Sequence, residues 1–167
     1  MFGLFTKGAK IRLTLPGDYS GELQVDCDMG DVEIGSFSGA DIVVEGDTGD
    51  VEVGAANTLS AQLSAGDLEV DQVASVRVIG DLGDVSIGSV TEYVNIQLNC
   101  GSVEIENMTL TQNSTIICDL GDVEIERISG VYVTASADVG HVKIYGNDES
   151  GTPLDISCQA GSVEVNQ

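Results

Sequence analysis

The feature that most constrains this chain is a five-residue block, Gly-Asp-Val-Glu-Ile or a close variant of it, that recurs eight times. The intervals between successive block glycines are 19, 17, 17, 18, 20, 19 and 21 residues. A period of this length is typical of solenoids, in which each repeat is one coil that buries its apolar face only by stacking on its neighbours. The blocks begin at Gly30, Gly49, Gly66, Gly83, Gly101, Gly121, Gly140 and Gly161.

Alternating apolar and polar residues precede and follow each block glycine. The positions seven and five before the glycine are mostly apolar, as in Leu23 and Val25, and the residue between them is mostly polar, as in Gln24. After the glycine, apolar residues fall at the second and fourth places, as in Val32 and Ile34. Period-two alternation places one set inside and the other in solvent. A glycine at a corner supplies the backbone angles that the change of phase requires.

These patterns predict an all-β fold, a single-domain parallel β-solenoid (β-helix) of about eight rungs with ~19 residues per rung. Each rung is expected to be a strand, a glycine corner, a second strand and a variable loop, such as residues 35–41. The domain covers residues 1–167, with 1–20 as N-terminal cap and opening strand and 21–167 as the repeat rungs.

Both ends of the stack need covers, because open strand edges pair with other chains. Ile11, Leu13 and Leu15 alternate up to Pro16, so they are expected to form the strand that starts the stack. The last rung in the sequence ends at Val165 and is expected to be the uncapped end.

The charge of the chain excludes one class of partner. The net charge is -22, and a surface this acidic repels phosphate backbones, so no nucleic-acid binding is predicted. Cations, basic partners and simple solubility remain open. Aromatic residues make up 4% of the chain and there is no Trp, so small and β-branched side chains must fill the core.

Stacking turns the repeat into columns of acidic residues, for which two interpretations remain open. Calcium could bridge carboxylates of neighbouring rungs, or each Asp could accept backbone N–H bonds in Asx-type turns. The Asp columns contain Ser, Asn and Gln at some rungs, which keep hydrogen bonding but lose charge, and this favours the turn. The columns are Asp31, Asp50, Asp67, Asp84, Ser102, Asp122, His141 and Ser162; Glu33, Glu52, Glu69, Ser86, Glu104, Glu124, Lys143 and Glu164; and Asp28, Asp47, Ser64, Asp81, Asn99, Asp119, Asp138 and Gln159.

The Glu column is expected to form a solvated acidic face, in which Lys143 would pair with Glu124 and Glu164. His141 is the only histidine and would lie beside Asp122. The chain has no CxxC motif and no Cys/His ligand spacing. We therefore predict no catalytic, cofactor-binding or metal-binding residues, and no enzyme.

The four cysteines fall in two apolar columns. Cys27, Cys118 and Cys158 stand three residues before their glycines, and Cys100 stands one before its own. All four are expected to be buried thiols. Cys118 and Cys158 are expected to lie two rungs, about 9–10 Å, apart, which is too far for a disulfide. Unpaired thiols favour a reducing compartment.

From Ile11 to Val165 the chain resembles the bacterial adhesin repeat domains. The resemblance lies in the Leu15-Pro16 pair that ends the opening strand and in rungs such as Gly49–Val53 and Gly121–Ile125. It implies a non-enzymatic structural or binding domain, an adhesin-like β-solenoid scaffold associated with the bacterial cell envelope. Its partner would then be a protein or another envelope component. Members of that family are similar to cell-envelope proteins, which are often attached to a membrane segment.

An alternative is a self-assembling cytoskeletal filament protein similar to bactofilins, which associate through the solenoid ends. Met1–Phe5, followed by Lys7 and Lys10, would suit membrane contact; otherwise Phe2, Leu4 and Phe5 cover the first rung. The location stays open between the cell envelope, which the resemblance implies, and the cytoplasm. The cytoplasm is expected if the chain is full length, because no signal peptide is recognisable and four cysteines are unpaired.

Overall fold

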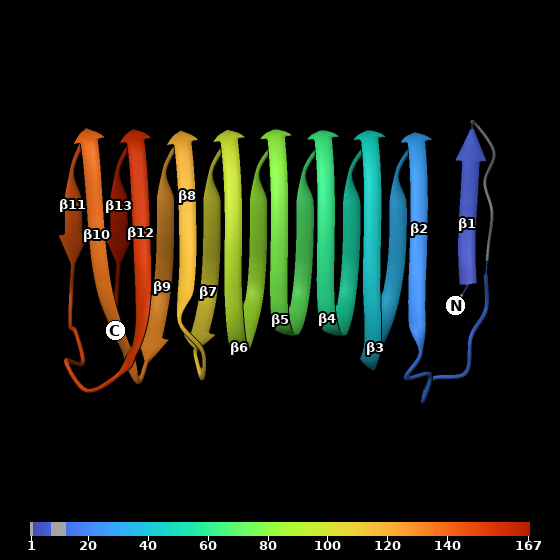
Figure 1. Ribbon diagram of the computed structural model, residues 1–167, viewed down its shortest axis with the longest axis horizontal. Coiled ribbons are helices and arrows are strands. Elements are labelled where there is room, and N and C mark those ends of the chain that lie inside the picture. The colour runs from blue at the N-terminus through green and yellow to red at the C-terminus, as the bar shows by residue number, and fades with distance from the viewer. Residues whose placement is uncertain (1, 8–12) are drawn as a thin grey trace.

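A computed structural model describes residues 2–7 and 13–167, and in these residues every regular element is a β-strand. Thirteen strands form one sheet that coils into a parallel β-solenoid, with rungs stacked along the long axis (Figure 1). The predicted fold class is therefore confirmed. The strands are β1 (Phe2–Lys7), β2 (Glu22–Met29), β3 (Val32–Thr48), β4 (Val51–Ala65), β5 (Leu68–Leu82), β6 (Val85–Cys100), β7 (Val103–Thr109), β8 (Ser114–Leu120), β9 (Val123–Ser129), β10 (Val131–Val139), β11 (Val142–Ile144), β12 (Thr152–Ala160) and β13 (Val163–Val165).

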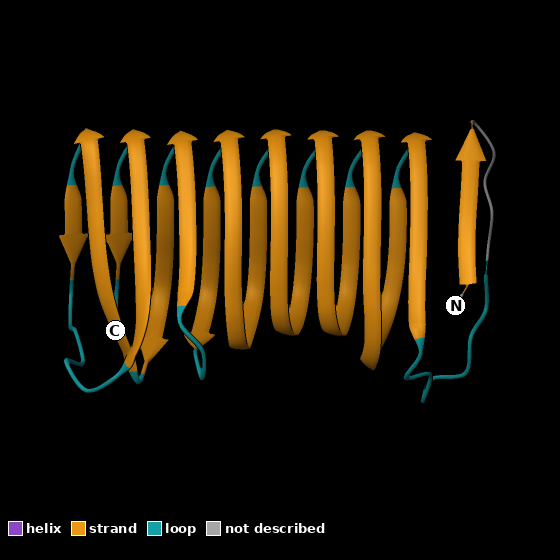
Figure 2. Ribbon diagram, in the orientation of Figure 1, coloured by secondary structure: helices purple, strands orange, loops and turns teal. Residues whose placement is uncertain are grey.

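Each rung turns sharply at its block glycine, and these corners form the upper edge in Figure 2. The corner glycines have φ values between 128° and 151°, a region that side chains with a Cβ rarely adopt. A Cβ on Gly83 would also collide with the carbonyl group of Gly66 in the neighbouring rung. Glycine is therefore required twice, for the turn itself and for the close approach of consecutive corners.

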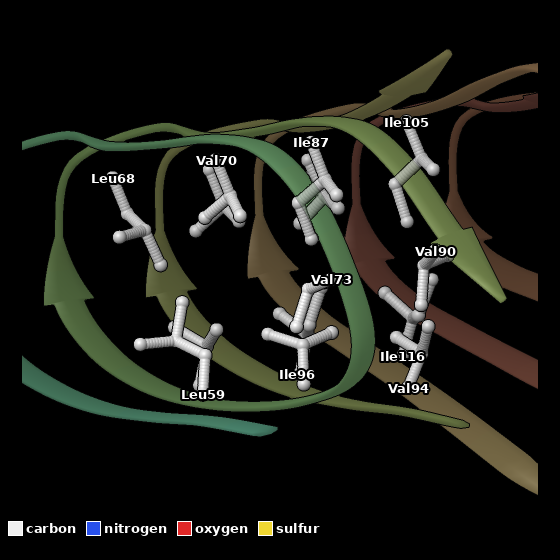
Figure 3. Packing of buried hydrophobic residues seen from close by; sticks show 14 of the residues in the cluster. Leu59, Leu68, Val70, Val73, Ile87, Val90, Val94, Ile96, Ile105 and Ile116 are labelled. Carbon is white, nitrogen blue, oxygen red and sulfur yellow. The ribbon is translucent and has the colours of Figure 1, made fainter. Parts of the chain in front are cut away.

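The opposite side of the rung differs from the prediction of a variable loop. In β3 to β6 the chain continues as strand around a gradual bend, and residues 35–41 belong to β3. Ser36 and Phe37 pair with Ala55 and Ala56 of β4, so ladder hydrogen bonding extends into the bend. These rungs therefore have one sharp corner and one gradual bend, and the backbone curves around the core (Figure 3).

The core consists of β-branched and leucine side chains that point into the coil from both sides and stack along the long axis. Leu68 and Val70 of β5 face Leu59 of β4 across the interior, and Ile87 and Ile96 of β6 repeat the arrangement one rung further (Figure 3). All five are at most 2% exposed. The predicted inward positions are thus confirmed for the central rungs.

The order of the rungs differs from the order of the sequence. The strand order is β6, β8, β12 and β10 on one side and β7, β9, β13 and β11 on the other. The last rung of the sequence, β12–β13, is inserted between β8–β9 and β10–β11, as the red strands between orange ones show in Figure 1. The prediction that the rung at Val165 forms the open end is wrong, and β10–β11 forms it.

Corner hydrogen bonds confirm this order. The N–H of Gly121 donates to the Ala160 carbonyl at 3.0 Å, and the N–H of Gly161 donates to the Val139 carbonyl at 2.9 Å. Sequence pattern could not show this, because every rung presents the same apolar faces and glycine corner to either neighbour.

At the N-terminal end, β1 pairs in parallel with β2, with Phe2 opposite Leu23. The segment that we expected to cover the first rung therefore pairs with the outer edge of that rung as a parallel strand. The predicted opening strand is wrong, because Leu13 and Leu15 lie outside any strand, while Ile11 falls outside the described residues. The chain instead turns after Pro16, where the Tyr19 N–H donates to the Pro16 carbonyl at 3.0 Å.

At the opposite end, the loop between β11 and β12 caps part of the outer edge of β10. The Val133 N–H donates to Oδ1 of Asn147 at 2.8 Å, and Nδ2 of Asn147 donates to the Val133 carbonyl at 3.0 Å. The Asn147 side chain thus takes the place of a neighbouring strand at this residue. The outer edges of residues 135–139 and of β11 have no pairing strand among the described residues.

Candidate functional site

The Asp column beside the corner glycines links each rung to the next. The backbone N–H groups of Asp50, Asp67 and Asp84 each donate to the Asp carboxylate of the preceding rung, at 3.3, 3.0 and 2.8 Å. Ser102 continues the series with a donation to Asp84 at 2.7 Å. The predicted acceptance of backbone N–H bonds is confirmed. The donor, however, belongs to the next rung and not to the Asp's own turn.

The hydrogen bonds of the same column also follow the order with the inserted rung. The N–H of Asp122 donates to Oγ of Ser102 at 3.5 Å, and the N–H of Ser162 donates to the Asp122 carboxylate at 2.7 Å. The prediction that His141 lies beside Asp122 is therefore wrong, because Ser162 occupies that place. His141 stands at the end of the column, on the outermost rung.

The outward Glu column is solvent-exposed at Glu33, Glu52, Glu69, Glu104 and Glu124, which confirms the predicted acidic face. It ends in a cation, because Lys143 follows Glu164 in register on the last rung of the stack. Nζ of Lys143 lies 3.4 Å from Oε2 of Glu164. The predicted pairing of Lys143 with Glu124 does not form, because β13 lies between them.

The column one residue before each glycine is the largest departure from the prediction. Met29, Leu82, Leu120 and Val139 are 66%, 56%, 53% and 70% exposed, although alternation placed this apolar column inside. The sharp corner starts before the glycine and turns these side chains outward. Cys100 belongs to this column and is half-buried, so its predicted burial is wrong.

We name the apolar part of this column the corner stripe. It is continuous over six neighbouring rungs, because each member pairs in register with the next. On one side lie Asp81, Asp119 and Asp138, and on the other lies the Asp column already described. The stripe consists of Ala65, Leu82, Cys100, Leu120, Ala160 and Val139.

Asp81 and Asp119, which stand two residues before their glycines, are held by side-chain amides of neighbouring rungs. Nδ2 of Asn99 donates to Oδ1 of Asp81 at 2.7 Å, and Nε2 of Gln159 donates to Oδ1 of Asp119 at 2.8 Å. These bonds offset the repulsion that stacked carboxylates would feel and fix the acidic border of the corner stripe.

The other three cysteines are buried, as predicted. Cys118 and Cys158 are direct register partners in adjacent rungs, so the prediction that they lie two rungs apart is wrong. Sγ of Cys118 donates to the Gly101 carbonyl and Sγ of Cys158 to the Gly121 carbonyl, both at 3.2 Å. Burial, with a smaller contribution from Cys158, raises the pKa of Cys118 to about 12, and burial also raises the pKa of Cys158.

In the described part of the chain, no three His, Cys, Asp or Glu side chains gather closely enough to hold a metal ion. No helix there is long and apolar enough to cross a membrane. A shallow depression over the first rungs is lined by several carboxylates, among them Asp26, Asp28, Glu45 and Asp47.

Comparison with known families places this geometry in context. The family model described as Toastrack DUF4097 matches residues 1–166. The chain belongs to the Toastrack DUF4097 family. In this Toastrack domain the match extends over every rung of the solenoid. Comparisons with curated proteins and with solved structures gave no match. The family description does not mention adhesion, so an adhesin-like role of the Toastrack domain is a matter for proposal.

Proposed function

We propose that this Toastrack domain is a non-enzymatic, adhesin-like scaffold of the bacterial cell envelope, and that it binds a protein partner through its corner stripe. The observation that supports this best is the exposure of Leu82, Leu120 and Val139 within an apolar stripe that continues along six consecutive rungs between two acidic borders. Exposed apolar patches rimmed by polar residues are typical of interaction sites.

The chemistry of the corner stripe indicates what the partner carries. Leu82, Leu120 and Val139 offer apolar contact, and Asp81 and Asp119 offer carboxylates that are already held in place by amides. A complementary segment has apolar side chains flanked by Lys or Arg. At about 4.8 Å per rung, the corner stripe is roughly 24 Å long. That length suits one extended or helical protein segment lying along the rod.

The role of the Asp column supports a scaffold and not a reaction centre. Its carboxylates each accept a backbone N–H group of the next rung, so they help to join the rungs. The result is a rod whose surface features repeat at a fixed spacing, which suits the presentation of a linear binding surface.

The test is binding of the purified chain to cell envelopes isolated from the organism that carries the gene. The paired substitutions Leu82→Ser and Leu120→Ser should weaken binding at least about tenfold. The partner would bury both Leu side chains, and the binding free energy lost with them exceeds the roughly 1.4 kcal/mol that corresponds to a factor of ten. A matched control is Ile79→Ser with Ile117→Ser. These residues are 39% and 36% exposed, lie on β5 and β8 as well, and are outside the corner stripe.

The control pair should bind like the unmodified chain. The corner stripe is not the binding surface if both pairs lose binding equally. The envelope role is wrong if the unmodified chain does not bind isolated envelopes.

A second candidate function, a self-assembling filament, is favoured by a different observation. The β10–β11 rung leaves part of its outer edge without a pairing strand among the described residues. It also carries His141 and Lys143 where other rungs carry mostly acids or Ser.

A further inference from the structure

We infer that the open end formed by β10 and β11 binds the first rung of a second copy of this chain, so that copies stack head to tail. This inference rests on the second candidate function and is independent of the corner stripe. Four features of the two ends support it.

The open end is a rung with an incomplete core. Ala135, Ala137 and Ile144 face the interior but are only half-buried, and Val142 is 38% exposed. Their register partners in the inserted rung, Ile156, Cys158, Val165 and Val163, are at most 2% exposed. A further rung of the same shape would bury these side chains as the inserted rung is buried.

The backbone groups at the two ends are complementary in the head-to-tail orientation, which continues the hydrogen bonding of the rung junctions. At each junction, the glycine N–H and the N–H two residues later donate to carbonyls of the following rung; for example, Val163 donates to His141 at 2.8 Å. The corresponding N–H groups on the last rung are those of Gly140 and Val142, and β11 pairs only with β13. On the first rung, the matching acceptor is the Asp31 carbonyl.

The charges select the same orientation. The Glu column begins at Glu33 and ends at Lys143. In a head-to-tail stack, Lys143 would lie between Glu164 of its own chain and Glu33 of the second copy. His141 would meet Asp31 in the same way. Two identical open ends would instead bring together two surfaces that each carry His141 and Lys143. At about 0.15 M salt the Debye length is about 8 Å, so these end charges act while the net charge of -22 is largely screened.

Each end carries a partial cover, and the parts left open correspond to each other. β1 lies on β2 in the position that β10 of another copy would take, and it reaches no further than Met29. Asn147 covers β10 only at Val133. The uncovered strands, β11 and the start of β3, carry the equivalent blocks Val142–Ile144 and Val32–Ile34. Displacing β1 should therefore strengthen stacking.

The experiment is sedimentation velocity of the full chain at about 0.15 M salt, with and without the paired substitutions Leu4→Pro and Phe5→Pro. Proline lacks the N–H group, and successive residues of a strand direct their N–H groups to opposite sides, so one of the two substitutions removes a bond to β2. The β1-disrupted chain should form dimers and longer stacks at concentrations at least tenfold below those that the intact chain needs.

Charge exchange then tests the contact itself in the β1-disrupted chain. Lys143→Glu alone and Glu33→Lys alone should each weaken association at least tenfold, and an equimolar mixture of the two variants should restore it, because every junction between one variant and the other pairs opposite charges. Glu124→Lys is the matched control, since it makes the same change in mid-column and should associate like its parent.

The inference is overturned if the β1-disrupted chain remains monomeric or if the mixture fails to restore association. It is also overturned if the intact chain associates and disruption of β1 abolishes this, because β1 itself would then be the contact. Envelope binding by monomers would be unaffected by either result, so failure here is distinguishable from failure of the corner-stripe proposal.

Discussion

The close approach of the corners predicts a large and position-dependent cost for alanine at the block glycines. In Gly83→Ala, the new Cβ meets the Gly66 carbonyl while the backbone is at φ 137°. The disfavoured backbone conformation costs about 1–3 kcal/mol, and separating the two overpacked corners costs about another 1–3 kcal/mol. The free energy of unfolding should therefore fall by about 2–6 kcal/mol, which can be measured by urea denaturation followed by circular dichroism.

Two other glycines separate these contributions. Gly30 has a similar φ of 128°, but its nearest neighbour to a Cβ is the Cys27 sulfur at 4.0 Å, so Gly30→Ala should cost only the backbone part, about 1–3 kcal/mol. Gly35 has ordinary backbone angles and nothing within 4 Å, so Gly35→Ala should be close to neutral. If Gly30→Ala destabilised the chain as much as Gly83→Ala, corner contact between rungs would not be the cause.

Three further predictions concern the thiols, the end cap and the acidic columns. The pKa of Cys118 rises from 9.0 unfolded to about 12 folded, so its contribution to stability is complete below pH 9.0 and is lost as the pH rises towards about 12. Cys118→Ala should therefore reduce the alkaline loss in the pH dependence of the unfolding free energy. Asn147→Ala removes two hydrogen bonds to Val133 and should lower the unfolding free energy by about 1–3 kcal/mol, with faster amide exchange at Val133. Calcium added at constant ionic strength should leave the melting temperature unchanged, because the Asp column already accepts backbone N–H groups; a rise would support cation binding instead.

The period of the repeat was sufficient to predict the rungs, their parallel stacking and the inward positions. These follow from the two-residue pleat and from the need of each coil for a neighbour, which are local properties visible in residues such as Leu68 and Val70. The chemistry of the Asp column was also predictable, since Asp beside glycine favours backbone N–H acceptance. Which rung supplies the N–H was not predictable, because an Asx turn and a bond between rungs use the same residue type.

The corner stripe and the rung order were missed for two different reasons. Continued up to the glycine, the alternation predicts that Leu82 and Leu120 point inward. The backbone leaves the regular pleat one residue before the glycine, so both side chains point outward. Rung order depends on the connections after β9 and β11, which make contacts of their own, such as the hydrogen bond from Oγ1 of Thr152 to the Leu110 carbonyl at 2.9 Å. Repeated rungs contain no comparable signal, since each interface resembles the others.

The inserted rung means that this solenoid cannot grow in the order in which the chain is synthesised. Residues 131–144 leave the ribosome before the β12–β13 rung on which they finally rest. Until β12 and β13 exist, the β10–β11 rung has no native neighbour, so it either waits unpaired or pairs with β8–β9 and must later separate. The native order is therefore reached only after the C-terminal segment has been synthesised and lies between two rungs that precede it in the chain. Loss of that segment would deprive two rungs of their native contacts, although only one is missing from the sequence.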